Sequence, residues 1–192
     1  MLEIALTKGM STVVDDEDYN RLIRFPWFYT KSSRCKNTHT GYAAYHQTSK
    51  SKWVWMHRFI LGMCNSAGTD LAPHMRVDHR DGNGLNNSRT NLRPCTRAQN
   101  GQNRKGNSDK RTSRYKGVFA RTNGNWRAAI RVNNVLLCLG TYPDEEMAAS
   151  VYNDAAVKYF GEFARLNNLQ SIPSVIIKLP QLIGLPKGKT SI

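Results

Sequence analysis

The residues best suited to chemistry lie in the stretch VDHRDGNGLNNSRTNLRPCTRAQNGQN, residues 77 to 103. Asp78 and His79 are adjacent there, and Asn91 and Asn100 follow among many other asparagines. Carboxylate and amide oxygens suit Mg²⁺ or Mn²⁺, and a histidine that titrates near neutrality suits a general base. Together with positive charge, these groups are what phosphodiester hydrolysis requires. The alternative is that the asparagines only shape turns in a solvated loop.

Short elements around this stretch are expected to position the acid and the imidazole. RVDH reads as a strand whose last two side chains point to opposite sides, and LRP as a second strand returning beside it. Thr96 and Gln99 form a capping-box signature for a following helix. Asn100, Asn103 and Arg104 would share one face of that helix. The prediction is therefore a hairpin leading into a helix, with carboxylate, imidazole and amide converging.

The segments VDHRDGN, LNNSRTNLRP and TRAQNGQNRK resemble the HNH (His-Asn-His, ββα-metal) nucleases, in particular phage free-standing and intron-encoded homing endonucleases. The resemblance covers roughly residues 57 to 105. It implies that Asp78 and Asn100 are metal ligands, that His79 is the general base and that Asn91 braces the loop that carries the base.

Two positions depart from the usual pattern of that family. Asn100 stands where many members have the final His, and Asn86 stands where many have an acid. We expect Asn83, Asn86 and Asn87 to shape a turn. His57 lies where such relatives often carry a His-Arg pair, and we favour a structural role for it over a phosphate contact.

The charge of the chain predicts a polyanionic partner. The net charge is +14, and the sequence pI is about 9.9. Basic residues cluster from Arg97 to Arg131 with Asp109 as the lone acid, which favours nucleic acid. No basic amphipathic helix indicates a membrane surface. Arg93 and Arg104 could contact phosphates or simply be solvated.

Cysteine usage and hydropathy indicate the cellular compartment in which the protein is expected. The four cysteines at positions 35, 64, 95 and 138 are scattered, which predicts reduced thiols rather than a zinc site or a disulfide framework. No signal peptide or transmembrane run is recognisable. We expect a cytoplasmic protein of a bacterial or phage-infected cell, not a secreted one.

Composition also predicts how the chain is divided. RKGNSDKRTSR, residues 104 to 114, has no apolar residue and cannot enter a core. We therefore expect a nuclease domain with an N-terminal β-rich extension at 1–104, a basic linker at 105–112 and a second domain at 113–168. A tail of unassigned role follows at 169–192. The Trp and Tyr residues of the first domain are expected to pack its core.

The second domain reads as three strands and one helix. YKGVFAR, NWRAAIRV and VLLCLGTY are strand-like and separated by turn residues. DEEMAASVYNDAAVKYF reads as a helix with Asp144 at its start and Gly161 at its end. Ala148, Val151 and Tyr152 fall on one apolar face of that helix.

This domain is similar to the plant APETALA/ethylene-response-factor DNA-binding domain through KGV, LGTY, the YNDAA helix and the LN ending, over residues 113 to 167. The resemblance implies a three-stranded sheet in the DNA major groove, backed by the helix. Alternation puts Trp126, Ala128 and Ile130 on the helix side. The side chains expected to face DNA are Lys116, Phe119, Arg121, Arg127 and Arg131. Phe119 and Ala129 do not match the base-reading positions of the plant domains, so no target sequence follows.

These observations predict an α+β protein, with a ββα-metal nuclease domain followed by a three-stranded antiparallel sheet packed on one helix. The expected function is site-specific cleavage of double-stranded DNA by a homing or mobile-element endonuclease. It would use one divalent metal, Mg²⁺ or Mn²⁺, and no small-molecule cofactor. One metal site per chain favours a monomer that nicks one strand, unless two chains act together. The alternatives are a DNA-binding regulator with a decayed nuclease domain and a nuclease that acts on RNA.

Overall fold

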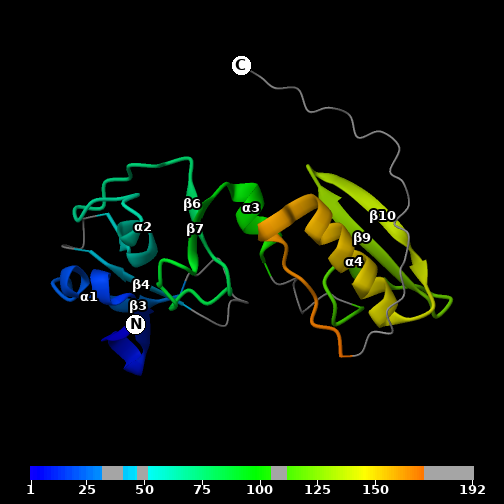
Figure 1. The fold of residues 1–192 in the computed structure, drawn as a ribbon, viewed down its shortest axis with the longest axis horizontal. Helices are drawn as coiled ribbons and strands as arrows, with labels where there is room; N and C mark the ends of the chain where they lie inside the picture. Colours follow the sequence, from blue (N-terminus) through cyan, green and yellow to red (C-terminus); the bar gives the residue numbers. More distant parts are fainter. Residues whose placement is uncertain (32–40, 47–51, 105–111, 171–192) are drawn as a thin grey trace, which may run out of the picture. The chain divides into compact units, whose positions relative to one another are not determined.

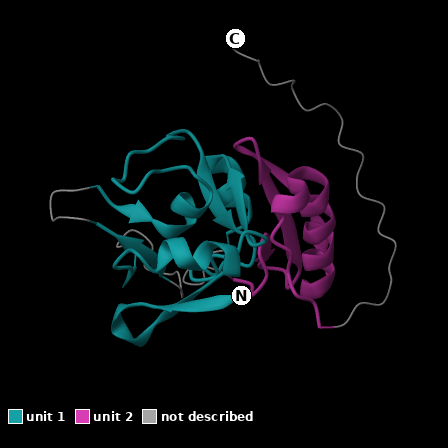
Figure 2. Ribbon diagram, turned by 60° about the vertical axis from the view of Figure 1, so that its left-hand side comes forward, with its two compact units in different colours: residues 1–105 teal, residues 106–192 magenta. Residues whose placement is uncertain are grey.

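The computed structural model describes residues 1–31, 41–46, 52–104 and 112–170. The chain divides into two compact units, Met1–Lys105 and Gly106–Ile192, which Figure 2 shows in different colours. Most of the expected basic linker and of the C-terminal tail lies outside the described residues.

The first unit begins with a β-hairpin and a short helix. Strands β1 (Leu2–Ala5) and β2 (Ser11–Val14) pair antiparallel, and the 3-10 turn η1 (Thr7–Gly9) joins them. Helix α1 (Asp16–Leu22) follows, with acidic residues in its first turn, where carboxylates favour the positive end of the helix dipole. Val13 of β2 also forms a parallel bridge to Asn86, so the hairpin supports the distant asparagine-rich loop.

A second, three-stranded antiparallel sheet has the order β3-β4-β5. Its strands are β3 (Phe28–Thr30), β4 (Tyr42–Tyr45) and β5 (Val54–Trp55), and helix α2 (Met56–Ile60) follows directly. The stretch WVWMHRFILG is apolar enough for one buried element. The chain instead changes from strand to helix at Met56, so the apolar residues of this stretch face the core from two elements.

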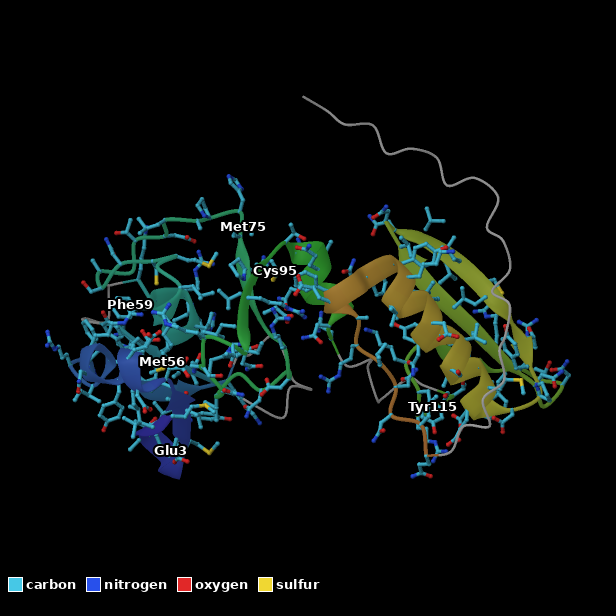
Figure 3. The ribbon with its side chains drawn as sticks, viewed as in Figure 1. Glu3, Met56, Phe59, Met75, Cys95 and Tyr115 are labelled. Atoms are coloured by element: carbon cyan, nitrogen blue, oxygen red, sulfur yellow. The ribbon has the colours of Figure 1, made fainter. Side chains whose placement is uncertain are left out.

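The core of the first unit lies between these sheets and α2. Met56 is fully buried in it and Phe59 packs against it (Figure 3). Trp27 and Tyr45 are also core residues, as expected. The expectation of core packing is wrong for Trp53, which is 46% exposed. Trp55 is half-buried and outside the core cluster as well, because alternation along β5 sends it to the face opposite Val54.

The asparagine-rich stretch forms a hairpin followed by a helix. Strands β6 (Arg76–His79) and β7 (Leu92–Cys95) pair antiparallel, and α3 (Arg97–Gln102) comes next. α3 contacts both strands. The predicted capping box is confirmed: Thr96 accepts from the Gln99 amide, and the Gln99 side chain accepts from the Thr96 amide.

The second unit is a three-stranded antiparallel sheet covered by one helix. The sheet order is β10-β9-β8, with β8 (Val118–Ala120), β9 (Trp126–Val132) and β10 (Val135–Tyr142). Helix α4 (Glu145–Phe160) crosses one face of this sheet (Figure 1). The predicted Asp144 cap is confirmed, since its side chain accepts from the Met147 amide, and Gly161 ends the helix at φ 53°.

Packing between α4 and the sheet follows the predicted alternation. Ala128 and Ile130 of β9 are buried against the apolar face of α4, and Trp126 packs at the margin. Gly117 has φ +77°, and a Cβ there would overlap the Tyr152 ring of α4. Asn167 closes the unit, because its side chain exchanges hydrogen bonds with the backbone N–H and C=O of Lys116.

The molecule is thus a mixed α/β protein of small antiparallel sheets and few helices. Cys64, Cys95 and Cys138 are free thiols. No helix in the described ranges is long and apolar enough to cross a membrane.

Candidate functional site

Strand β6 places Asp78 and His79 at its carboxyl end. Across the hairpin Asp78 pairs with Arg93, and His79 pairs with Leu92. Both side chains are nearly buried, at 5% and 6% exposure. Because adjacent strand residues point to opposite sides, the carboxylate and the imidazole have separate surroundings.

The imidazole of His79 is held by Asn87 and, through it, by Thr12. Nε2 of His79 lies 3.4 Å from Oδ1 of Asn87, and Nδ2 of Asn87 donates to the Thr12 hydroxyl at 2.8 Å. That hydroxyl donates its single hydrogen to Leu85 O at 2.7 Å, so it can only accept from Asn87. The chain of bonds fixes the amide of Asn87 with its oxygen toward His79. Nε2 therefore carries the proton, and Nδ1 holds the lone pair that a base needs.

The surroundings of His79 favour its neutral form. Burial lowers the pKa of His79 below its ordinary value, although the Asn87 bond and the charges of Asp81 and Asp78 act in the opposite direction. The ring of His57 lies 5.2 Å away in an edge-on arrangement. Burial and the neighbouring His79 hold the pKa of His57 well below its usual range. A neutral imidazole with a defined tautomer can accept a proton from water.

The carboxylate of Asp78 is held from two sides. Arg93 donates to Oδ2 from Nε at 2.9 Å and from a terminal nitrogen at 2.6 Å. Nδ2 of Asn103 lies 3.1 Å from Oδ1 and 3.0 Å from Oδ2, and it also donates to the backbone oxygen of His79. Buried charges need such partners, since a lone carboxylate inside a protein is costly.

Two expectations change with this arrangement. Arg93 was expected among the DNA contacts, but it is only 5% exposed and its guanidinium bonds to Asp78. The amide that reaches Asp78 belongs to Asn103, whereas Asn100 was expected there. Asn100 lies half-buried on α3, one turn earlier, and its role as a metal ligand stays a prediction. Arg104 is exposed and keeps its predicted access to phosphate.

Asn91 ties the loop between β6 and β7 together. Its Nδ2 donates to Asn86 O at 2.8 Å and to the Asp81 carboxylate at 3.0 Å, and its Oδ1 accepts from the Asp81 amide at 3.1 Å. The loop backbone also pairs with β2, because Val13 donates to Leu85 O and accepts from the Asn87 amide. These bonds hold Asn87 beside His79.

Asn87 and Asn103 are functional candidates that sequence reasoning missed. Asn87 had been assigned to turn formation, yet it is fully buried. Its partner Thr12 lies 75 residues away along the chain, so no local pattern connects the two. The helical face shared by Asn100 and Asn103 was the one signal that could have pointed to Asn103.

A divalent cation would have to use a small set of ligands here. No three His, Cys, Asp or Glu side chains gather as a cation site within the ranges that the structure describes. Asp78 fits the chemistry, because it is a carboxylate whose Oδ1 accepts a longer bond of 3.1 Å from Asn103, the residue that caps the helix carrying Asn100. Mg²⁺ and Mn²⁺ favour oxygen ligands and keep several waters, so one carboxylate with one amide oxygen is a sufficient protein contribution.

In the second unit, the sheet face opposite α4 carries Phe119, Arg127 and Arg131, three of the side chains expected at DNA. Arg127 pairs with Phe119 across β8 and β9, and its guanidinium lies 5.3 Å from the centre of that ring. Phe119 is 41% exposed, and Arg121 and Arg131 are exposed as well. Lys116 is half-buried, with its backbone tied to Asn167. The face thus combines cations with a solvent-accessible ring.

Comparison with known proteins gives matches to most of the chain and to parts of it. The family model described as HNH endonuclease matches residues 68–102. An uncharacterized HNH endonuclease of Acanthamoeba polyphaga mimivirus is 31% identical over 162 residues, which cover 84% of this chain and 77% of that protein.

Plant proteins match a part of the chain only. An AP2/ERF and B3 domain-containing protein of Oryza sativa subsp. japonica is 48% identical over 56 residues, or 29% of this chain and 15% of its own length. Dehydration-responsive element-binding protein 2D of Arabidopsis thaliana is 43% identical over 72 residues, or 36% of this chain and 35% of its own length. The chain therefore spans a small share of these plant relatives.

Proposed function

Because the chain belongs to the HNH endonuclease family, we propose that it is a site-specific DNA endonuclease of the homing or mobile-element type. The observation that carries this proposal is the environment of His79. A nearly buried imidazole that has one nitrogen committed to Asn87 is suited to proton transfer rather than to packing.

In the proposed reaction, Nδ1 of His79 accepts a proton from a water molecule while the oxygen of that water attacks the phosphorus. The bond between the phosphorus and the leaving oxygen then breaks, and the leaving oxygen takes a proton from solvent water. Asn87 holds the ring in the required tautomer, and Asn91 keeps the surrounding loop in place. A divalent cation at Asp78 and Asn100, Mg²⁺ or Mn²⁺, would neutralise the charge that develops on the phosphate.

The second unit would bind double-stranded DNA and position the nuclease unit at a defined sequence. Its similarity to plant AP2/ERF proteins and its face of Arg121, Arg127 and Arg131 support this division of labour. Such a unit makes a small and otherwise unselective nuclease site-specific, which is what a homing element needs. With one set of catalytic residues per chain, a monomer would nick one strand.

The test is cleavage of supercoiled plasmid by the full chain with and without Mg²⁺ or Mn²⁺, followed by mapping of the cut sites. We expect metal-dependent nicking at defined positions. His79→Ala should abolish nicking and leave DNA binding unchanged, because the base acts in the chemical step and does not contribute to DNA affinity. Arg24→Ala, at an exposed position just after α1 and outside the site, serves as the control and should retain nicking.

Three results would contradict the proposal in different ways. Binding without cleavage under every metal condition would identify a DNA-binding regulator with a decayed nuclease unit. Cleavage of RNA in preference to duplex DNA would change the substrate. Cleavage by His79→Ala at the wild-type rate would remove the assignment of the base.

A further inference from the structure

The sheet β3-β4-β5 has an aromatic surface on the side opposite the core. Val54 and Met56 are buried at 1% and 0% exposure, whereas Trp53 is 46% exposed and Trp55 and His57 are half-buried. Ala44 pairs with Trp55 on one side and with Phe28 on the other, so the three share this outer face. The outer rings belong to six residues that we call the aromatic face: Phe28, Tyr42, His46, Trp53, Trp55 and His57.

The rings of the aromatic face contact one another in a continuous row. Trp53 and Trp55 stack with 5.8 Å between ring centres and 22° between planes. Trp55 and His57 stack at 6.1 Å and 27°. At the other end, Phe28 and His46 lie 5.2 Å and 5.4 Å from Trp53 in edge-on and tilted contacts. The near-parallel part of the row is thus Trp53, Trp55 and His57.

This row ends at the proposed catalytic base. The ring of His57 lies 5.2 Å from that of His79, and the ring of Tyr42 lies 5.9 Å from it. Tyr42 also contacts Trp55 and His57. A ligand that lies along Trp53 and Trp55 therefore reaches the position where the phosphodiester is cut.

Core packing accounts for Phe28, which contacts the hydrophobic cluster of this unit, but not for the two tryptophans of the aromatic face. Trp53 and Trp55 are outside the hydrophobic cluster of this unit, and 46% of Trp53 is exposed. Large apolar rings gathered at the surface mark a binding site more often than an accident of packing. Their flat faces suit a flat and aromatic ligand.

The charge around the face points to a nucleic acid as that ligand. Residues 1–105 contain 16 Lys and Arg against 8 Asp and Glu. Lys31 and Lys52, at the ends of β3 and β5, are exposed, as is Arg80 after His79. Aromatic platforms with cationic surroundings bind single strands, because every base offers a face for stacking. Bases in an intact duplex already stack on each other and cannot use such a platform.

We propose that the aromatic face binds unpaired bases of the DNA strand that is cut, next to the scissile phosphate. The inference rests on the proposed nuclease function and deepens it. It makes the preferred substrate of the first unit a DNA strand that is locally open, while the second unit holds the flanking duplex.

The experiment measures binding of short oligothymidylate and of a blunt duplex to the full-length His79→Ala protein, which does not cut. In this background Trp53→Ala should weaken oligothymidylate binding roughly ten-fold, the scale of one base stacked on one ring. Trp53→Phe keeps an aromatic ring and should retain most of the affinity. Both variants should bind the blunt duplex as the parent does. Thermal unfolding of each variant shows whether the exposed position has been changed without loss of fold.

Cleavage gives a second readout in the protein with His79 intact. It should nick a duplex with a small internal bubble faster than a fully paired one, and Trp53→Ala should remove that preference. Oligothymidylate affinity that is unchanged in Trp53→Ala would overturn the proposal, as would binding of oligouridylate but not oligothymidylate. A protein that binds oligothymidylate through Trp53 but never cleaves DNA would refute the nuclease function and leave the aromatic face standing.

Discussion

Asn87 fixes the orientation of the His79 ring, with 3.4 Å between Oδ1 of the amide and Nε2 of the imidazole. The amide is in turn oriented by Thr12 of β2, whose hydroxyl accepts from Nδ2 of Asn87. The proposed base on β6 is therefore positioned by the N-terminal hairpin, an element outside the hairpin-and-helix segment that carries the other site residues.

Asn87→Ala should lower nicking about ten- to hundred-fold while DNA affinity stays the same, because a base contributes most when its lone pair is correctly aimed. The loss of a buried hydrogen-bonding group should also lower the free energy of unfolding by roughly 1–3 kcal/mol. Rates of plasmid nicking, measured well below the unfolding temperature, test the first expectation.

Thr12→Val is the matched control for Asn87→Ala. It removes the same bond to the Asn87 amide but leaves Oδ1 of Asn87 beside His79, so its stability loss should be similar and its loss of rate smaller. Equal rate losses in the two variants would mean that Asn87 acts only through the fold.

Arg93→Met should destabilise the first unit by about 3–5 kcal/mol, since it leaves the nearly buried Asp78 carboxylate without its cation. Arg104→Met, at an exposed site, should change stability by less than about 0.5 kcal/mol. Urea unfolding of the two variants compares them directly. If Arg93→Met were as stable as the parent and weakened DNA binding, Arg93 would be a DNA contact after all.

The helices and strands were predicted well because the patterns that specify them involve residues close together in the sequence. The Thr96–Gln99 capping box and the Asp144 cap each depend on residues three apart, and both form as expected. Alternation in β9 likewise places Ala128 and Ile130 under α4.

The site could be predicted only in part, because its decisive contacts join residues far apart in the chain. Asn87 reaches Thr12 over 75 positions, and Asn103 reaches Asp78 over 25. Residue type alone suggested that Asn87 shapes a turn and that Arg93 contacts phosphate. Both side chains are buried, so each binds other side chains inside the protein instead. The residue type of Trp53 and Trp55 favoured core packing, but Val54 takes the core side of β5 and leaves Trp55 on the opposite face.

Asp18 makes the stability of the first unit depend on pH. Burial alone would raise the pKa of this carboxyl, but hydrogen bonds and charge from Arg89 and Arg21 lower it below its ordinary value of 3.8. A carboxyl with a lowered pKa stabilises the fold above its unfolded pKa, and the effect is lost as the pH falls through the folded value. Acid should therefore remove the Asp18 contribution only below about pH 3.8.

Asp18→Asn should lower the free energy of unfolding by about 1–3 kcal/mol at neutral pH, because it removes the charge from a buried carboxylate that accepts hydrogen bonds from the exposed Arg89. The gap to the parent should close as the pH falls below the Asp18 pKa. Asp16→Asn is the control: its partner is the exposed amino terminus, so the change should stay under about 1 kcal/mol. Urea titrations across the acid range give both curves, and a gap that does not depend on pH would contradict the charge-based explanation.

Arg131→Ala in the second unit should weaken duplex binding and reduce the slope of log affinity against log salt by roughly one, the effect of one lost phosphate contact. Arg131 is exposed on the sheet face opposite α4, where its side chain donates to Asn134 O. Arg121→Ala should act in the same way. Lys158→Ala removes the same charge from an exposed position on α4 and should leave the slope unchanged, because the helix covers the other face of the sheet. Anisotropy titrations of the three variants at several salt concentrations make the comparison, and equal slopes for Arg131→Ala and Lys158→Ala would show that this sheet face does not meet the DNA.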